Sequence, residues 1–230
     1  MSRLFVITLG FEEKYVVRML TRYGVGPEDL LLVFTGPRTQ MSEKAVRILA
    51  DFLSKYYEST SLEVVETKPA DGFGQLLEKM YEEVSGRAGQ YDEVVFNLSG
   101  GMRMLCLAAL MTAQLLSASH PKVRVELETE DSSALIPVPR AAVSLPLTLA
   151  ELTAEKLEVL REISHTPTTA KTISARLGKD ESSVRKHLAT LTSLGLAETI
   201  GERPRKYIAT PTGRTVAKAL QKKTQGTRTV

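Results

Sequence analysis

The fold of this 230-residue chain is decided by the stretch Val94-Val95-Phe96-Asn97-Leu98-Ser99-Gly100-Gly101-Met102-Arg103-Met104-Leu105. Residues 92–96 are rich in β-branched and aromatic side chains, which predicts a short buried strand. Residues from 102 onward are almost wholly apolar and predict a helix. Small polar residues and two glycines separate the two segments, so we expect a strand, a turn and a helix in direct succession.

The turn between these segments is predicted to bind an anion. The first turn of a helix directs free backbone N–H groups toward a ligand, at the positive end of the helix dipole. Gly100 and Gly101 allow the backbone to approach a ligand closely. Asn97 and Ser99 add hydrogen-bonding groups, and the guanidinium of Arg103 is suited to a phosphate. We therefore expect a phosphodiester site, although two glycines in such a turn are also compatible with tight packing alone.

Two common nucleotide sites are disfavoured by the same turn. It lacks the Gly-Lys-Ser/Thr of a P-loop, and it lacks the Gly-x-Gly-x-x-Gly of a dinucleotide fold. An ordinary nucleoside triphosphate or NAD site is therefore not expected.

The rest of the first part alternates strands with helices. Strands are predicted at residues 3–8, 30–35, 62–66, 123–127 and 134–138, and helices at 12–22, 42–56 with Ser42 as the N-cap, and 73–84. The strands are continuously apolar, which is typical of a Rossmann-like α/β domain with a mostly parallel sheet covered on both faces. If the strand order is 3-2-1-4-5, the first and fourth strands are neighbours.

In such sheets, ligands bind beyond the carboxyl ends of the strands, where the strand order reverses. Small and polar residues gather at three of these ends. The predicted ligand-binding residues are Thr8, Leu9, Gly10, Phe11, Thr35, Gly36, Pro37, Asn97, Leu98, Ser99, Gly100, Gly101, Met102 and Arg103.

From Thr148 the pattern changes to short amphipathic helices. Helices are predicted at 152–163 and 169–177, a third begins at the N-cap Asp180, and a basic hairpin at 197–209 precedes a last helix from Pro211 to Leu220. This order predicts a winged helix-turn-helix, with the third helix reading DNA. In the alternative interpretation, the basic residues of the third helix form a solvated face and the domain contacts only protein. The predicted DNA-binding residues are Thr169, Ser182, Ser183, Arg185, Lys186, Arg203, Arg205 and Lys206.

Charge separates the two parts. The whole chain has a formal net charge of +3. Residues 1–150 hold 15 Lys and Arg against 19 Asp and Glu, a net charge of −4, whereas residues 151–230 hold 15 against 8, a net charge of +7. Double-stranded DNA is therefore expected to contact only the second part.

Other features exclude several classes. The single cysteine, Cys106, cannot form an internal disulfide, and the three histidines are scattered, so we expect no metal site and no cofactor. We expect no membrane span and no signal peptide, because no apolar run is long enough and Met1-Ser2-Arg3 leads directly into a strand. These features fit a reducing cytoplasm.

With both parts in place, the chain resembles the archaeal CRISPR-associated transcriptional regulators that join a CARF domain to a winged helix. Residues 97–103 resemble the most characteristic CARF motif, and residues 8–11 resemble the motif after the first strand. The predicted division is a CARF domain for ligand binding and dimerisation at 1–138, a linker at 139–150 and a winged helix-turn-helix at 151–230.

The resemblance implies a function in antiviral defence. In that family two CARF domains form one two-fold pocket for cyclic tetra-adenylate, and the winged helices bind promoters of CRISPR-associated genes. The protein is therefore expected to be a ligand-gated homodimeric regulator and not an enzyme. Two alternatives stay open: a ring nuclease that cleaves the cyclic oligoadenylate, or a regulator that responds to another nucleotide.

Overall fold

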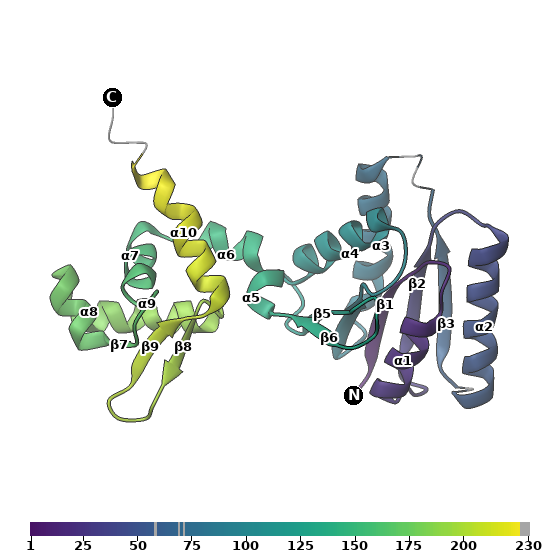
Figure 1. Cartoon of the computed structure of the whole chain (residues 1–230), viewed down its shortest axis with the longest axis horizontal. Coiled ribbons are helices and arrows are strands. Elements are labelled where there is room, and N and C mark those ends of the chain that lie inside the picture. The colour runs from purple at the N-terminus through teal and green to yellow at the C-terminus, as the bar shows by residue number, and fades with distance from the viewer. Residues whose placement is uncertain (58, 69, 71, 226–230) are drawn as a thin grey trace. The chain divides into compact units, whose positions relative to one another are not determined.

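The computed structural model describes residues 1–57, 59–68, 70 and 72–225. It divides into two compact units, Met1–Ser144 and Leu145–Val230 (Figure 1).

The first unit is built on a six-stranded sheet with the order β3-β2-β1-β4-β5-β6. The first five strands in the chain run parallel, and β6 pairs antiparallel with β5. The predicted mostly parallel sheet, with the first and fourth strands side by side, is therefore confirmed. The strands are β1 (Arg3–Leu9), β2 (Leu30–Thr35), β3 (Ser61–Glu66), β4 (Glu93–Asn97), β5 (Val123–Glu128) and β6 (Leu135–Val138).

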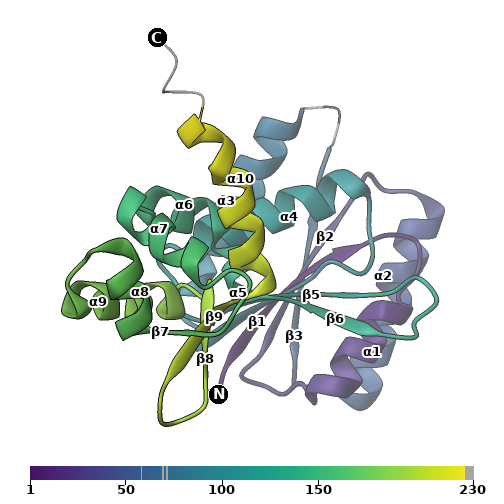
Figure 2. The same ribbon diagram turned by 60° about the vertical axis from the view of Figure 1, so that its left-hand side comes forward.

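Helices cover both faces of this sheet (Figures 1 and 2). On one face, α1 (Lys14–Tyr23) and α2 (Gln40–Tyr56) pack against alternate residues of β1 and β2. On the other, α3 (Phe73–Ala88) and α4 (Arg103–Leu116) enclose the second core. Burial on both faces explains the apolar run in the central strand β1, whose four residues 4–7 are all fully buried.

The start of α2 differs from the prediction. Ser42 is not the N-cap, because the helix begins at Gln40 and is capped by Thr39. The Thr39 hydroxyl accepts a hydrogen bond from the Ser42 N–H at 3.1 Å, and the Ser42 hydroxyl accepts one from the Thr39 N–H at 2.9 Å. This reciprocal capping box places the cap three residues earlier than the sequence pattern indicated.

The second unit has the elements of a winged helix-turn-helix. They are α6 (Leu145–Glu151), α7 (Ala154–Glu162), β7 (Thr168–Thr169), α8 (Ala170–Leu177), α9 (Glu181–Ser193), β8 (Ala197–Ile200), β9 (Lys206–Ala209) and α10 (Pro211–Gln225). The strands form a sheet with the order β7-β9-β8, in which both pairs are antiparallel.

Local signals in the sequence set the limits of the central helices. Thr169 caps α8, and Gly178 ends it in the left-handed conformation at φ 62°. Asp180 caps α9 as predicted. The buried stripe of α9, formed by Val184, Leu188 and Leu191, packs this helix into the unit.

The segment predicted as a linker is helical. Residues 140–143 form the short helix α5 (Arg140–Val143), and α6 occupies 145–151. Ala141 and Val143 are buried, and Val143 belongs to the core shared by α3 and α4. The apolar side chains of α5 therefore join it to the first unit, and the division between the units falls after Ser144.

Candidate functional site

The three predicted turns meet at one cavity. Because β1 lies between β2 and β4, the segments after these strands are neighbours at the carboxyl edge of the sheet. Together they enclose a volume of about 560 Å³, within the range typical of sites for small ligands. The cavity is lined by Leu9, Gly10, Phe11, Glu12, Tyr15, Gly36, Pro37, Thr39, Ser42, Gly100, Gly101 and Met102.

The glycines let two of these turns touch. A Cβ on Gly10 would lie 3.0 Å from the Gly101 nitrogen, and a Cβ on Gly101 would lie 3.0 Å from the Thr8 Cβ. Gly101 also has a φ of 94°, which favours glycine. The Thr8 hydroxyl donates to the Gly100 carbonyl at 2.5 Å. The glycines therefore serve tight backbone packing, and the same packing brings the β1 and β4 turns to one side of the cavity.

The start of α4 keeps its anion-binding potential. Its N-cap, Met102, is in the extended conformation and makes no side-chain capping hydrogen bond. The first N–H groups of a helix have no partner within the helix, and a ligand anion can supply one. Met102 lines the cavity and is 41% exposed, so this helix end begins at the cavity wall.

Several predicted ligand-binding residues lie behind the cavity wall. The buried Asn97 side chain donates to the Glu126 carboxylate at 3.0 Å and accepts from the Ser99 N–H at 3.2 Å. The Ser99 hydroxyl accepts from the Glu128 N–H at 2.9 Å. These bonds fix the shape of the β4–α4 turn, and neither Asn97 nor Ser99 lines the cavity.

The second predicted turn is fixed in a similar way. Thr35 at the end of β2 is buried, and its carbonyl accepts hydrogen bonds from the N–H and the hydroxyl of Thr67. Thr8 near the end of β1 is buried as well. Neither residue lines the cavity, and the partly buried Leu98 does not line it either.

A buried ionic cluster supports the β4–α4 turn from the side opposite the cavity. Glu126, which is 3% exposed, accepts from Arg22 at 3.0 Å and from the Tyr23 hydroxyl at 2.8 Å. Glu128 forms an ion pair with Arg18 at 2.9 Å. Burial, followed by the bond to Glu126, raises the pKa of Tyr23 to about 12. The sequence held a signal that was missed, because Glu126 and Glu128 alternate with apolar residues in β5 and are buried there.

The cavity lining is mainly apolar and holds no Lys or Arg among the described residues. Its one carboxylate, Glu12, forms an exposed ion pair with Lys14 at 2.5 Å. Arg103 is exposed at the first position of α4, beside the lining residue Met102, but does not itself line the cavity. The lining residues that sequence reasoning missed are Glu12, Tyr15, Thr39 and Ser42, which belong to the segments following the predicted turns.

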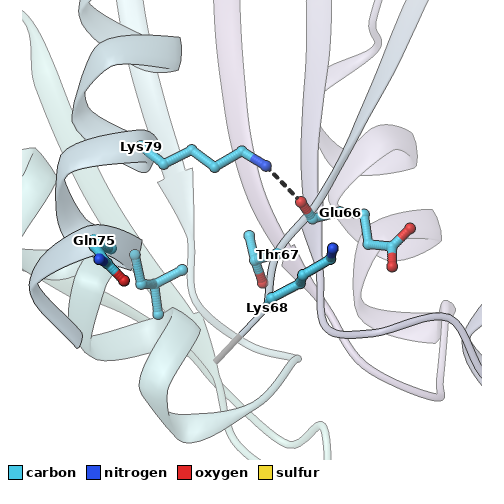
Figure 3. Close-up of a pocket in the computed structure, with 6 residues that line it drawn as sticks. Glu66, Thr67, Lys68, Gln75 and Lys79 are labelled. Carbon is cyan, nitrogen blue, oxygen red and sulfur yellow. Dashed lines mark hydrogen bonds between the residues drawn. The ribbon is translucent and has the colours of Figure 1, made fainter. Parts of the chain in front are cut away.

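A second hollow of about 740 Å³ lies beyond the end of β3. Figure 3 shows Lys79 reaching from α3 toward Glu66, whose backbone carbonyl accepts from its ammonium at 2.7 Å. None of the predicted ligand-binding residues lines this hollow, which lies at the edge strand and not at the reversal of strand order. The cavity at β1, β2 and β4 is therefore the candidate ligand site.

The predicted DNA-binding residues are mostly exposed. Ser182, Ser183, Arg185 and Lys186 lie on the solvent side of α9, and Arg203, Arg205 and Lys206 lie in or beside the turn from β8 to β9. Arg185 forms an ion pair with Glu181, one turn earlier on α9. Thr169 is partly buried, and its hydroxyl accepts from the Thr172 N–H at 3.2 Å.

Hydrogen bonds from Ser182 and from the Ser183 N–H lower the pKa of Asp180, the N-cap residue of α9.

Over the described part of the chain, no three His, Cys, Asp or Glu residues gather as a metal site would require. No helix in that part is long and apolar enough to cross a membrane.

Fold and site together define a two-part protein, in which a Rossmann-like domain with a cavity at the strand ends is followed by a helix-turn-helix region. Residues 3–139 match the family model of the Csa3 CRISPR-associated Rossmann-like domain, and the chain belongs to this family. Residues 157–201 match the IclR helix-turn-helix domain.

The chain is also similar to individual proteins. The chain is 28% identical over 217 residues to the "CRISPR locus-related putative DNA-binding protein Csa3" of Thermoproteus tenax, covering 94% of this chain and 95% of the relative. Among solved structures, Csm6 of Enterococcus italicus bound to cyclic hexa-2′-fluoro-hexa-dAMP matches 84% of this chain with a TM-score of 0.52 and 10% identity, which shows similarity of fold. ZitR of Lactococcus lactis matches 34% of this chain with a TM-score of 0.31 and 23% identity. The chain spans 55% of that Csm6 chain and 57% of that ZitR chain.

Proposed function

We propose that this protein is a cytoplasmic, homodimeric transcription regulator of CRISPR-associated genes that binds promoter DNA and senses cyclic tetra-adenylate. The observation that carries the proposal is the convergence of three turns on one cavity in a Csa3-family domain whose chain continues into a winged helix-turn-helix. The name of the Thermoproteus tenax relative describes that protein as DNA-binding.

The cavity suits a ligand that combines phosphates with flat bases. Its apolar wall includes Phe11, which is 60% exposed, and Tyr15. Aromatic faces stack on bases, and each such contact contributes about 1–3 kcal/mol. The free N–H groups at the start of α4 are suited to phosphate oxygens. Since no basic side chain of the described residues lines the cavity, backbone groups and the neighbouring Arg103 would neutralise most of the ligand's charge.

Dimer formation is supported by an apolar stripe on α4. Leu107, Met111 and Leu115 follow one another at four-residue intervals and are 57%, 40% and 48% exposed. Large side chains at this spacing form one helix face, and burial of such a face stabilises association. We infer that a second copy of this chain covers the stripe. Because α4 begins at the cavity wall, a two-fold axis beside it would bring the ligand turns of both copies together.

The winged helix supplies a face for DNA. The exposed cations of α9 and of the β8–β9 turn can neutralise phosphates, and the first turns of α9 can reach base edges.

Calorimetry of the purified full chain with cyclic tetra-adenylate tests the proposal. We expect saturable binding of one ring per two chains, and weaker binding of linear tetra-adenylate and of cyclic hexa-adenylate. If neither ring binds, cyclic tetra-adenylate is not the ligand. A preference for another nucleotide would favour a regulator that responds to that nucleotide.

Ring cleavage is the alternative activity. One observation favours it: Glu12 places a carboxylate in the cavity, where it could accept the proton of an attacking 2′-hydroxyl. Chromatography of cyclic tetra-adenylate after long incubation with the protein and with Glu12→Gln separates the two functions. Intact ligand in both samples supports the regulator, and cleavage by the unmodified protein alone supports the nuclease.

A further inference from the structure

The second unit contains a small basic pocket that is not part of the predicted DNA-binding face. It lies between the end of α7 and α10, has a volume of about 160 Å³, and is lined by Arg161, Ser164, His165, Arg214, Ala217 and Lys218. Three of these side chains are cations at neutral pH, and a fourth is an imidazole. None is a carboxylate.

The two arginines are held in place by the backbone. Arg161 is partly buried and donates to the Leu220 carbonyl at 3.3 Å, and Arg214 is partly buried and donates to the Ala209 carbonyl at 2.8 Å. Each guanidinium has five N–H donors in a fixed planar arrangement. The bond from Arg214 goes to a neutral carbonyl, so it orients this guanidinium without cancelling its charge.

The segment that follows α7 and the helix α10 hold no acidic residue, and the carboxylates of Glu158 and Glu162 on α7 form ion pairs with Lys179 and Arg176. The sequence has no Asp or Glu between Glu162 and Asp180, and none from Pro211 to Gln225. Arg214 lies in the first turn of α10, at the positive end of the helix dipole, where a cation is unfavourable. Like charges gathered in one partly buried pocket repel one another, and a bound anion would relieve that repulsion.

The pocket lies away from the DNA face of the unit. In the pairing of β7 with β9, Thr169 lies opposite Lys206, next to the β8–β9 turn, whereas the Ala209 N–H donates to the Ile163 carbonyl at the other end of β9. The pocket residues Ser164 and His165 follow Ile163 directly. No residue of α9 or of the β8–β9 turn lines the pocket.

We propose that this pocket binds a single phosphate group. Its volume is less than a third of the 560 Å³ of the ligand cavity, and it lies below the range of about 300–1,000 Å³ typical of sites for whole small molecules. Guanidinium groups match the oxygens of a phosphate in geometry and in charge. The site does not depend on the function proposed for the first unit.

Thermal unfolding of the full chain tests the site. Inorganic phosphate is titrated against chloride at constant ionic strength, for the unmodified protein, Lys218→Gln, Arg214→Gln/Lys218→Gln, and a control with exposed lysines outside the pocket, Lys44→Gln/Lys171→Gln. Binding to the native state raises Tm with ligand concentration. We expect phosphate to stabilise the unmodified protein and the control equally, with at least a fivefold weaker apparent affinity in Lys218→Gln and no specific effect in the double variant.

Equal phosphate responses in all four proteins would overturn the proposal, as would a response to phosphate no larger than the response to chloride. Lys218→Gln keeps the test valid if loss of the Arg214 bond to Ala209 impairs folding. A second titration in saturating duplex DNA identifies the source of the phosphate group. If a DNA phosphodiester occupies the pocket, duplex suppresses the phosphate response, whereas a small phosphorylated ligand leaves the response intact.

Discussion

At the scale of single residues, the structure separates groups that shape the ligand turn from groups free to contact a ligand. Asn97 is buried and uses both ends of its amide inside the protein, on Glu126 and on the Ser99 N–H. Arg103 is exposed, and no hydrogen bond or ion pair of its side chain occurs among the described residues. The two residues were predicted together as ligand contacts, yet their surroundings give them different tasks.

Replacing Arg103 with alanine should therefore weaken ligand binding without changing stability. A hydrogen bond to a charged group contributes about 1.5–3 kcal/mol, which corresponds to roughly 10-fold to 150-fold in Kd. Calorimetry with cyclic tetra-adenylate checks the expected loss, and urea unfolding checks the fold. Arg47→Ala, an exposed arginine on α2 outside the cavity lining, is the matched control and should bind normally. Equal affinity of both variants would remove Arg103 from the site.

Tyr23 gives the protein a specific pH dependence. Because its pKa is raised from 10.0 to about 12, chiefly by burial, the folded state favours the neutral phenol. The resulting stabilisation is complete below pH 10 and is lost as the pH rises toward 12. Urea unfolding of the unmodified protein should show a steeper fall in stability over this range than Tyr23→Phe. Parallel curves for the two proteins would contradict the assigned environment of Tyr23.

At the scale of helices and strands, α9 and the β8–β9 turn carry the proposed DNA face. Lys186 is exposed on α9 and forms no ion pair among the described residues, whereas Arg185 must exchange its contact with Glu181 for a phosphate. Lys186→Ala should lower the slope of log affinity against log salt by about one unit. Fluorescence anisotropy with promoter duplex measures this slope. Lys44→Ala, an exposed lysine on α2, should leave it unchanged, and equal slopes for both variants would contradict the DNA face.

The apolar stripe of α4 leads to a prediction about assembly. Met111→Glu places a charge among Leu107 and Leu115, and a charge without a partner in a buried interface is costly. Analytical ultracentrifugation should show dimers for the unmodified protein and monomers for this variant. The control Met41→Glu changes a methionine that is 61% exposed on α2, and it should remain dimeric. A dimeric Met111→Glu protein would place the interface elsewhere.

The elements of the fold could largely be predicted from the sequence, because apolar runs and caps are local signals. β2 has the predicted limits, the hairpin of β8 and β9 spans the predicted residues 197–209, and α9 begins after the predicted cap. The cap of α2 was predicted wrongly, since Thr39 and Ser42 both suit that position and only the geometry distinguishes them. The helical character of residues 140–151 was also missed, because the burial of Val143 depends on a core distant in the sequence.

The candidate cavity was predictable in its location and less so in its lining. The βαβ pattern was compatible with the order β2-β1-β4, which the sheet shows and which brings the three turns together. Which side chains face the cavity depends on packing between elements. Asn97 and Ser99 turn toward β5, while Tyr15 and Ser42, which lie in the first turns of α1 and α2, face the cavity.

At the scale of the whole molecule, ligand-gated regulation requires that a ligand bound in the first unit changes the DNA affinity of the second. Linkage is reciprocal, so the ligand and the DNA must alter each other's affinity by the same factor, commonly about 5–150-fold. The division after Ser144 is the place where this coupling must pass along the chain. A long Gly/Ser insertion between Ser144 and Leu145 should preserve both affinities and abolish their coupling.

The most direct test is a pair of anisotropy titrations of promoter duplex with the unmodified full chain, with and without saturating cyclic tetra-adenylate at fixed salt. We expect two curves whose midpoints differ by about fivefold or more, with the same factor recovered when ligand affinity is measured with and without duplex. Superimposable DNA curves, in a sample where calorimetry shows the ligand to be bound, would contradict the gating of DNA binding by the ligand.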